Sequence, residues 1–278
     1  MNSGKRRTST RLSANHQRSW LWGRHAVLET LKAGRWPIVE LFVDSKTPQP
    51  EIEDAQRLVE PHDIDLQTVD SERLTQLCQS YEHQGFVARM GEFPCDDIQS
   101  LAIAARQAHL STRAYEATSE SAVLPPIFAM CDRIQDAHNF GAILRCCDAM
   151  NAKGIVIGDR YQSAITPHVA RSSAGAVNHL NIYRVPQLNE AVAMLKTENY
   201  QIIAATEKAE SRLWDAELTQ PMVILIGSET SGIAEDLLSL CDLQLGVPML
   251  GGVNSLNAAV AAGIVLYECR RQQTTHKK

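Results

Sequence analysis

The sequence predicts an α/β protein whose C-terminal part is built on a mainly parallel sheet. After Pro126, short apolar runs alternate with helical patterns at the spacing typical of parallel strands. A second, smaller set of strand and helix patterns fills residues 20–95. We therefore expect a basic flexible arm at residues 1–19, a small α/β domain at 20–95, a linker at 96–126 and a large domain at 127–278.

The first 19 residues differ in charge from the rest of the chain. The chain has 278 residues and a net charge of −5, but residues 1–19 hold five basic and no acidic side chains, which leaves −10 for the remainder. A basic arm on an acidic body suggests a phosphate-backbone partner. A solvated tail explains this feature equally well, so both interpretations stay open.

Composition excludes several other classes of protein. The longest apolar stretch, residues 258–267, is far shorter than the roughly 18 to 20 residues that a membrane span needs. No secretory apolar region follows the basic N-terminus. The seven cysteines include no C-x-x-C pair, so neither a disulfide framework nor a zinc site is indicated. We expect a reduced, cytoplasmic protein without a metal or a membrane partner.

The helices and strands of the small domain are predicted from its apolar residues, which recur at helical or alternating spacing. Gly34 ends its first helix and Ser71 is a plausible cap of its last. The expected order is helix 23–33, strand 38–43, helix 51–59, strand 64–69, helix 71–78 and strand 85–90.

The linker is expected to start with a helix from Asp96 to about Ala108. A Ser/Thr/Glu-rich segment and Pro125-Pro126 follow this helix. The large domain then gives six strands, at 127–131, 154–158, 181–185, 201–205, 222–226 and 243–247. Its helices are expected at 139–150, within 166–176, at 188–197, at 234–240 and at 255–271, the last being apolar enough to be buried.

Two glycine-containing polar segments follow the last two predicted strands, within residues 225–257. In open α/β sheets, ligands bind outside the carboxyl ends of strands. Gly227 and Gly251 let the backbone approach a ligand, and Glu229, Ser255 and Asn257 supply polar side chains. The first segment lacks the Lys-Ser/Thr of a phosphate-binding loop, so a ligand held by backbone amides and apolar walls fits better.

A third polar segment precedes the helix predicted at 139–150. Asn139 is a candidate cap of this helix, and Arg145 lies on an otherwise apolar stretch. Burying an arginine without a partner is costly, so we expect Arg145 to meet an anion, either a ligand or a core carboxylate. Ser255, taken alone, reads as the cap of the last helix.

These three segments together resemble a known family. The patterns are N-x-G-x-x-x-R at 139–145, I-G-S-E-x-x-G at 226–232, and V-P-M followed by N-S-L-N at 247–257. Their order and spacing resemble the motifs of the SpoU/TrmH-type RNA 2′-O-ribose methyltransferases of the SPOUT superfamily. In the small domain, GRHAVLETLKAG and HQGFVA are similar to the substrate-binding domain of the two-domain members.

The resemblance implies a fold, a cofactor and an assembly. The large domain is then a SPOUT domain with a C-terminal trefoil knot, which is a rare exception among folds. S-adenosylmethionine binds in the knot, and the protein is a homodimer whose site is completed across the interface. The cofactor-binding residues implied are Gly227, Ser228, Val247, Met249 and Leu256.

The resemblance also implies catalytic roles. Arg145 acts at the ribose 2′-hydroxyl, and because a guanidinium has a pKa above about 12 we favour charge stabilisation and phosphate orientation over proton abstraction. Asn139, Glu229, Ser255 and Asn257 align the arginine, the ribose and the cofactor, with Glu229 as the anchor of Arg145. Relatives often have Asp-Pro where this chain has Asp136-Ala137, so this loop is expected to be less rigid.

RNA contacts are expected outside the motifs as well. Residues 160–184 contain three arginines and two histidines but no acidic residue. We predict that this segment faces RNA or lies near the dimer interface, with Arg171 and Ser172 as phosphate contacts. In the small domain, Arg24 is the candidate RNA-binding residue.

The resemblance favours methylation of a guanosine in 23S ribosomal RNA, because two-domain relatives include enzymes with that substrate. A tRNA ribose methyltransferase is the alternative within this class. A non-catalytic RNA-binding protein of ribosome assembly is the alternative from another class, although the intact Asn139, Arg145, Glu229 and Asn257 argue against it.

Overall fold

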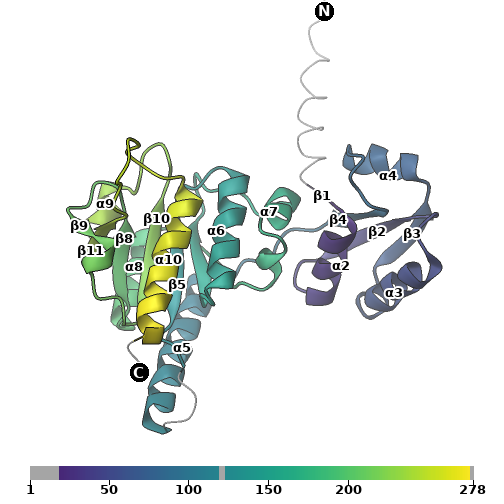
Figure 1. Ribbon diagram of the computed structural model, residues 1–278. Helices are drawn as coiled ribbons and strands as arrows, with labels where there is room; N and C mark the ends of the chain where they lie inside the picture. The colour runs from purple at the N-terminus through teal and green to yellow at the C-terminus, as the bar shows by residue number, and fades with distance from the viewer. Residues whose placement is uncertain (1–18, 119–122, 276–278) are drawn as a thin grey trace, which may run out of the picture. The chain divides into compact units, whose positions relative to one another are not determined.

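The computed structural model describes residues 19–118 and 123–275, and forms two compact units (Figure 1). The first unit comprises the chain up to Pro94 together with residues 165–179, and the second comprises residues 95–164 and 180 onward. The predicted basic arm at residues 1–19 lies, apart from Ser19, outside the described residues.

The first unit contains a four-stranded mixed sheet in the order β1-β4-β2-β3. β4 is antiparallel to both β1 and β2, whereas β2 and β3 are parallel. Its strands and helices are β1 (Trp20–Trp22), α2 (Arg24–Ala33), β2 (Ile38–Asp44), α3 (Gln49–Val59), η1 (Glu60–His62), β3 (Asp65–Val69), α4 (Ser71–Cys78) and β4 (Phe86–Met90). The expected elements are confirmed, and β1 is an additional strand.

Local signals explain where these helices begin and end. Gly34 takes a left-handed φ of 62° directly after α2, a conformation that glycine adopts without strain. Ser71 was predicted to cap α4, but the cap is Asp70, whose carboxylate accepts a hydrogen bond from the Arg73 N–H at 2.7 Å. An aspartate one residue upstream therefore provides the capping oxygen.

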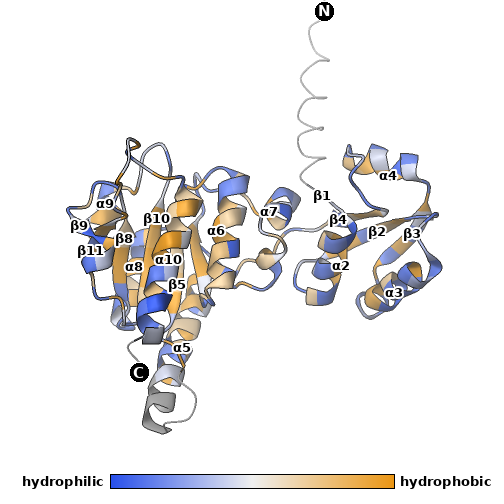
Figure 2. Cartoon of the chain, in the orientation of Figure 1, coloured by the Kyte–Doolittle hydropathy of each residue, from blue (hydrophilic) through white to orange (hydrophobic). Residues whose placement is uncertain are grey.

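The second unit is built on a seven-stranded sheet in the order β7-β6-β5-β10-β8-β11-β9, and all its pairings are parallel. Its strands are β5 (Ile127–Asp132), β6 (Gly154–Gly158), β7 (Ile182–Val185), β8 (Gln201–Ala205), β9 (Ser211–Arg212), β10 (Met222–Gly227) and β11 (Leu243–Gly246). β5 and β10 at its centre are hydrophobic along almost their full length, as parallel strands covered on both faces usually are (Figure 2). The predicted α/β class and mainly parallel sheet are confirmed.

Helices cover both faces of this sheet. Leu101, Ala191 and Leu237, from α5 (Ile98–Thr118), α8 (Leu188–Thr197) and α9 (Glu235–Leu238), share one core cluster with Phe128 and Met130 of β5. α6 (Ala137–Ala149) and α10 (Ala258–Thr275) pack against each other and against the sheet on its other side (Figure 1). The sheet is therefore enclosed between two helical layers.

Part of the predicted linker is a packed helix. α5 is longer than the helix expected to end near Ala108, and the buried Leu101 and Ala105 belong to the core of the second unit. The Ala105 carbonyl accepts a hydrogen bond from the Tyr200 hydroxyl at 3.0 Å, and Arg106 forms a salt bridge with Glu198. Residues 98–112 thus belong structurally to the large sheet.

Residues 165–179 cluster with the first unit, although the sequence division places them in the large domain. They form α7 (Pro167–Ser172) and η2 (Ala176–Asn178). The Asn178 amide donates to the Thr30 hydroxyl at 3.1 Å, and His179 lies 3.1 Å from a Glu29 carboxylate oxygen. These contacts join η2 to α2.

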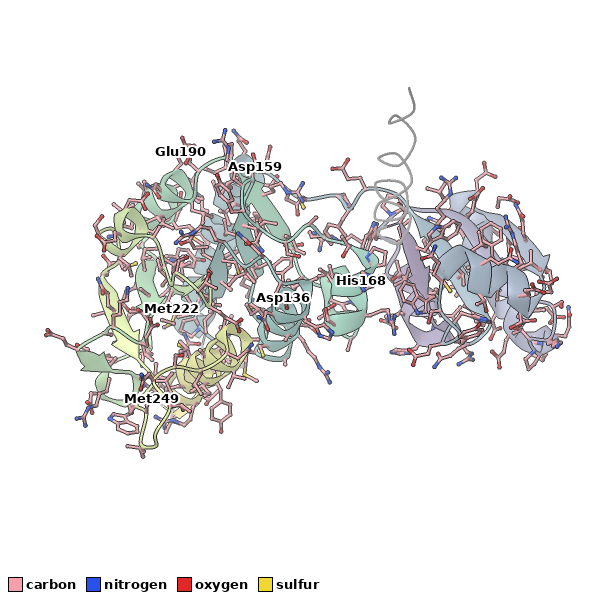
Figure 3. All side chains as sticks on the ribbon, turned by 90° about the horizontal axis from the view of Figure 1, so that it is seen from above. Asp136, Asp159, His168, Glu190, Met222 and Met249 are labelled. Atoms are coloured by element: carbon pink, nitrogen blue, oxygen red, sulfur yellow. The ribbon has the colours of Figure 1, made fainter. Side chains whose placement is uncertain are left out.

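Two helix starts differ from the predictions. α6 begins at Ala137, directly after Asp136, which Figure 3 labels. Asp136, not Asn139, is its cap, and the Asp136 carboxylate accepts a hydrogen bond from the Asn139 N–H at 2.8 Å. α10 begins at Ala258, three residues later than expected, and its cap is Asn257 instead of Ser255. α10 buries only one face, because Val260, Ile264 and Tyr267 are exposed. Within the described residues, no helix is long and apolar enough to cross a membrane.

Candidate active site

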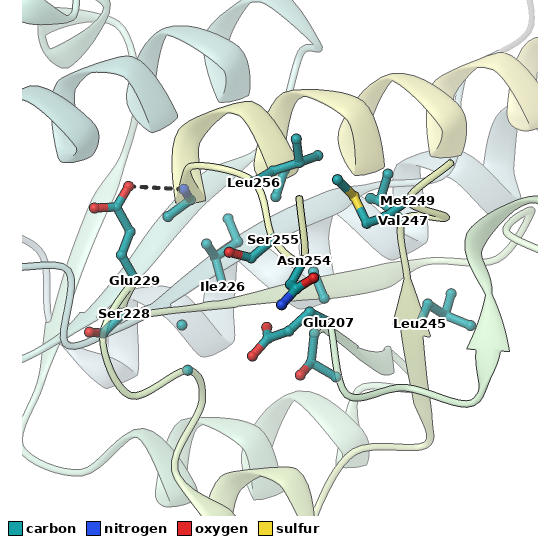
Figure 4. A pocket seen from close by; sticks show the side chains of 16 residues that line it. Glu207, Ile226, Ser228, Glu229, Leu245, Val247, Met249, Asn254, Ser255 and Leu256 are labelled. Atoms are coloured by element: carbon teal, nitrogen blue, oxygen red, sulfur yellow. Dashed lines mark hydrogen bonds between the residues drawn. The ribbon is translucent and has the colours of Figure 1, made fainter. Parts of the chain in front are cut away.

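A pocket lies at the carboxyl edge of the large sheet, where the segments after β8, β10 and β11 meet (Figure 4). Because these strands are parallel, the loops that follow them emerge at the same edge. The lining residues are Ala205, Thr206, Glu207, Ile226, Gly227, Ser228, Glu229, Gly232, Leu245, Val247, Met249, Asn254, Ser255, Leu256, Ala258 and Ala261. All five predicted cofactor-binding residues line this pocket.

The loop after β10 folds tightly on itself. The Ser228 N–H donates to the Gly232 carbonyl at 3.2 Å and the Gly232 N–H donates to the Ser228 carbonyl at 2.8 Å. A Cβ atom at Gly227 would lie 2.4 Å from backbone atoms of Gly232 and Ile233, closer than real Cβ atoms come to other atoms. Only glycine therefore fits at the base of this loop.

Asn257 connects the last helix to two other segments of the site. Its carbonyl oxygen Oδ1 accepts from the N–H groups of Ala259 and Val260, at 3.0 and 3.3 Å, and so caps α10. Its amide nitrogen Nδ2 donates to the Asn139 side-chain oxygen at 2.9 Å and to the Glu229 carboxylate. Glu229 also accepts from the backbone N–H of Ala258 at 3.3 Å (Figure 4). The amide orientation is consistent, since each end meets partners of the opposite kind.

Four of the five predicted catalytic residues therefore lie at the pocket or bond to its rim. Glu229 and Ser255 line the pocket, and Asn257 joins Glu229 to Asn139. The expectation that Glu229 anchors Arg145 is not met in the single chain, because the Glu229 carboxylate is engaged by Asn257 and the N-terminus of α10. A helix N-terminus favours such a negative charge.

Arg145 is the predicted catalytic residue that remains unpaired. It is exposed on α6 and makes no hydrogen bond or salt bridge with any residue in the described ranges. The alternative in which a core carboxylate neutralises Arg145 is thus wrong for this chain. Gly141, four residues before Arg145 in α6, is buried. An exposed guanidinium without an internal partner is available to an anionic ligand.

Sequence reasoning missed Thr206 and Glu207, which line the pocket together with Asn254 of the N-S-L-N motif. Glu207 follows β8, and its exposed side chain points toward Asn254 in the centre of the view (Figure 4). The signal was present, because β8 was predicted to end at Ala205 and its carboxyl end must lie at the same edge as that of β10. The adjacency of β8 and β10 in the sheet is what the sequence does not reveal.

The predicted RNA-contact residues all have partners within the first unit. Arg24 donates to Glu51 at 2.6 Å. The Arg171 guanidinium lies over the Trp22 ring, 4.4 Å from its centroid, and 3.5 Å from a Glu82 carboxylate oxygen. Ser172, the third candidate, donates its hydroxyl to a backbone carbonyl one turn earlier in α7. Both arginines are partly exposed, so a phosphate would compete with carboxylates for them.

The two thiols of α6 are poorly suited to act as nucleophiles. Burial raises the pKa of the Cys147 thiol well above its usual range, and burial also raises the pKa of Cys146. Both thiols stay protonated near neutral pH and are poor nucleophiles. The described part of the chain contains no group of three or more His, Cys, Asp or Glu side chains that could hold a metal ion.

Comparison with protein families identifies both parts of the chain. Residues 126–267 match the SpoU rRNA Methylase family, and residues 20–94 match the family described as RNA 2′-O ribose methyltransferase substrate binding. The chain belongs to the SpoU family. As a SpoU-family member it is an RNA 2′-O-ribose methyltransferase with an N-terminal substrate-binding domain.

A curated relative agrees with this assignment, and solved structures share the fold. The SpoU-family chain is 30% identical over 259 residues to YacO of Bacillus subtilis, named as a TrmH family tRNA/rRNA methyltransferase, covering 93% of this chain and 98% of YacO. It shares its fold with the SpoU methyltransferase AviRb of Streptomyces viridochromogenes in complex with AdoMet, with a TM-score of 0.72, 24% identity and coverage of 98% and 95% of the two chains. An AdoMet-bound rRNA methyltransferase of Sinorhizobium meliloti has a TM-score of 0.75 at 21% identity, covering 95% and 91%.

Proposed function

We propose that this enzyme transfers the methyl group of S-adenosylmethionine to a ribose 2′-hydroxyl of ribosomal RNA, most specifically a guanosine of 23S RNA. The observation that carries the proposal is the bonding of Asn257 to both Glu229 and Asn139. It links the loops that line the pocket to the helix that presents the unpaired Arg145. The AdoMet-bound AviRb and Sinorhizobium meliloti proteins share the fold and support the choice of methyl donor.

The residues of the pocket fit S-adenosylmethionine. Apolar side chains of Ile226, Leu245, Val247, Met249 and Leu256 offer the walls that an adenine ring requires. The Glu207 carboxylate suits the ammonium or ribose hydroxyls of the cofactor. We propose that backbone groups of Gly227, Val247 and Leu256, with Ser228 and Met249 beside them, hold the cofactor.

For this reaction, the protein must position a weakly acidic ribose hydroxyl. When bound, S-adenosylmethionine supplies an electrophilic methyl group on a sulfonium. We propose that Arg145 binds the phosphate next to the target ribose and stabilises negative charge on the 2′-oxygen as its proton passes to solvent water. The new O–CH3 bond replaces the S–CH3 bond, and S-adenosylhomocysteine is the product that leaves. Asn139, held by Asn257, and Ser255 orient the ribose. Orientation of this kind is worth several kcal/mol of the barrier, roughly up to 7 to 11 in ideal cases.

Substitution of Arg145 tests this assignment. Because the side chain is exposed and unpaired in the described structure, Arg145→Ala should leave the melting temperature unchanged and lower kcat for RNA methylation about 10²- to 10³-fold. The matched control is Arg271→Ala, which removes an exposed arginine of α10 that pairs with Glu268. Normal methylation by a folded Arg145→Ala protein would remove Arg145 from the mechanism.

The substrate is tested by mapping ribose methylation in total RNA with and without the gene. Loss of one mark in 23S RNA supports the proposal, whereas loss of a tRNA mark supports the alternative within the class. If no 2′-O-methyl mark disappears, the non-catalytic assembly protein becomes the better interpretation. A second test uses purified enzyme, tritiated methyl donor and 23S or tRNA transcripts. It shows whether the enzyme methylates the RNA directly or whether loss of the gene removes the mark indirectly.

We propose that the enzyme is a cytoplasmic homodimer, as the family resemblance implies. The support in this chain is an apolar stripe on α10, made of Val260, Ile264 and Tyr267, which are 50%, 39% and 60% exposed. Spacing of four and three residues places these side chains on one face of the helix. A second copy of the chain is the proposed occupant of this stripe. The C-terminal trefoil knot also stays a prediction of the resemblance.

A further inference from the structure

The central strand β5 ends in a carboxylate that the family motifs do not include. Asp132 is only 4% exposed, and a buried carboxylate is costly unless it is paired and hydrogen-bonded. Its two oxygens accept from the neighbouring Arg133 guanidinium, with both N···O distances at 3.0 Å. Oδ2 also accepts from the backbone N–H of Ala234 at 2.8 Å. Asp132 therefore also forms a hydrogen bond with a segment 102 residues later in the chain.

Arg133 contacts the same distant segment. Its Nη2 donates to the Gly232 carbonyl at 3.3 Å, in addition to its bond with Asp132. Its backbone is left-handed, with φ of 58°, a conformation that is uncommon for residues other than glycine. In this conformation the Arg133 guanidinium lies between the end of β5 and the loop after β10, where it bonds both. Non-glycine residues in such conformations occur often where a structure holds a functional element in place.

Together, these two residues hold the base of the loop that carries Glu229. Gly232 and Ala234, which accept and donate the bonds just described, lie at the end of that loop. Its other side closes through the paired bonds of Ser228 with Gly232. Glu229 lies between these fixed points, and its carboxylate bonds Asn257.

The same short connection also leads to the helix that carries Asn139. Ile134 is held on both sides, since its N–H donates to the Gln162 side chain at 3.1 Å and its carbonyl accepts from the Ser163 N–H at 2.7 Å. Asp136 then caps α6. Residues 132–136 thus connect the Glu229 loop with the start of α6 through a chain of fixed contacts.

We propose that Asp132 and Arg133 are positioning residues, which set the Glu229 loop at the distance from Asn139 that the Asn257 bridge requires. This inference rests on the proposed roles of Glu229 and Asn139 in methyl transfer. Neither residue lines the pocket, so the pair acts through the loop and not by touching the cofactor.

The test uses Arg133→Asn in the full-length protein, because asparagine tolerates a left-handed backbone but lacks the guanidinium. We expect faster amide hydrogen exchange at residues 228–234, unchanged exchange in the interior of β10, and about tenfold weaker binding of S-adenosylmethionine by calorimetry. Asp132→Asn should act in the same direction. The matched control, Arg106→Gln, removes an arginine that pairs with Glu198 elsewhere in the same unit and should change neither readout.

A double-mutant cycle separates positioning from general stabilisation. If Arg133 acts through Glu229, Arg133→Asn should weaken cofactor binding much less in a Glu229→Gln background than in the wild type. Equal losses in both backgrounds, or exchange that rises throughout the unit instead of at 228–234, would overturn the proposal. Hydrogen exchange and cofactor binding do not depend on turnover, so an enzyme inactive on every RNA tested would count against the proposed function alone.

Discussion

The side-chain amide of Asn257 donates to the side-chain oxygen of Asn139, 118 residues earlier in the chain, at 2.9 Å. The same nitrogen donates to Glu229, while the Asn257 oxygen caps α10. One side chain therefore fixes the start of the last helix and the meeting point of three predicted catalytic residues. Its two ends can be tested separately.

Asn257→Asp should separate catalysis from stability. Aspartate caps helices as well as asparagine does, so the start of α10 should stay intact. The new carboxylate oxygen would face the Glu229 carboxylate and the Asn139 oxygen without a proton to donate. We expect kcat to fall about 100-fold, a loss typical of one misplaced polar group. Asn257→Ala removes both functions and should lower the melting temperature as well, which serves as the comparison.

Gly227→Ala should disrupt the pocket through steric overlap. The added Cβ would lie 2.4 Å from backbone atoms of Gly232 and Ile233, and backbone cannot move away as a flexible side chain can. We expect at least tenfold weaker binding of S-adenosylmethionine and a loss of roughly 1 to 3 kcal/mol in the free energy of unfolding. The matched control is Gly251→Ala, because a Cβ there has no atom within 4 Å. Equal effects of the two substitutions would contradict this explanation.

The position of Gly227 illustrates what the sequence could predict. Apolar runs followed by glycine and polar residues mark the carboxyl ends of β10 and β11 locally, so the position of the pocket followed from periodicity. The five residues proposed to bind the cofactor came from the resemblance to the family. The last helix was placed three residues too early because Ser255 and Asn257 are both good caps. The choice between them depends on contacts with Asn139 and Glu229, which no local pattern encodes.

The second unit shows the same limit on a larger scale. α5 was assigned to a linker because the helix expected from Asp96 to Ala108 is followed by a Ser/Thr/Glu-rich segment and Pro125-Pro126. α5 is buried because it packs against α8 and β7. The sequence does not show that these two elements lie beside it, because their position depends on the order of strands in the sheet. Glu207 escaped notice for a related reason, since the sequence does not show that β8 lies between β10 and β11 in the sheet, with its carboxyl end at the pocket.

Replacing one apolar residue of the α10 stripe by a charge tests the proposed homodimer. Ile264→Glu should leave the fold unchanged, since the side chain is 39% exposed in the single chain, but should place a carboxylate in the interface. We expect sedimentation equilibrium to show a monomer where the wild type is a dimer, with a corresponding loss of RNA methylation. Thr275→Glu, on the exposed end of the same helix, is the control. A wild-type protein that is monomeric at micromolar concentration would contradict the dimer directly.

Arg270 should be among the most important side chains for stability. It is 7% exposed, and its guanidinium donates to the carbonyls of Met150, Pro125 and Asn151, each at 2.7 Å, and to Gln273 at 2.6 Å. These bonds tie α10 to the turn after α6 and to the segment before β5. Arg270→Met keeps the volume but leaves the carbonyls without donors, so we expect a loss of about 2 to 5 kcal/mol in the free energy of unfolding.

The pH dependence of this effect follows from the pKa of Arg270. Burial lowers that pKa to about 10, so the guanidinium is protonated in both the folded and the unfolded chain below about pH 9. The stability difference between wild type and Arg270→Met should therefore be constant between about pH 6 and 8, and it should be measured by urea unfolding at both values. Arg271→Met, which removes an exposed arginine, should leave the urea midpoint close to that of the wild type. If the urea midpoint of Arg270→Met matched that of Arg271→Met, the four hydrogen bonds of Arg270 would not hold the helix in place.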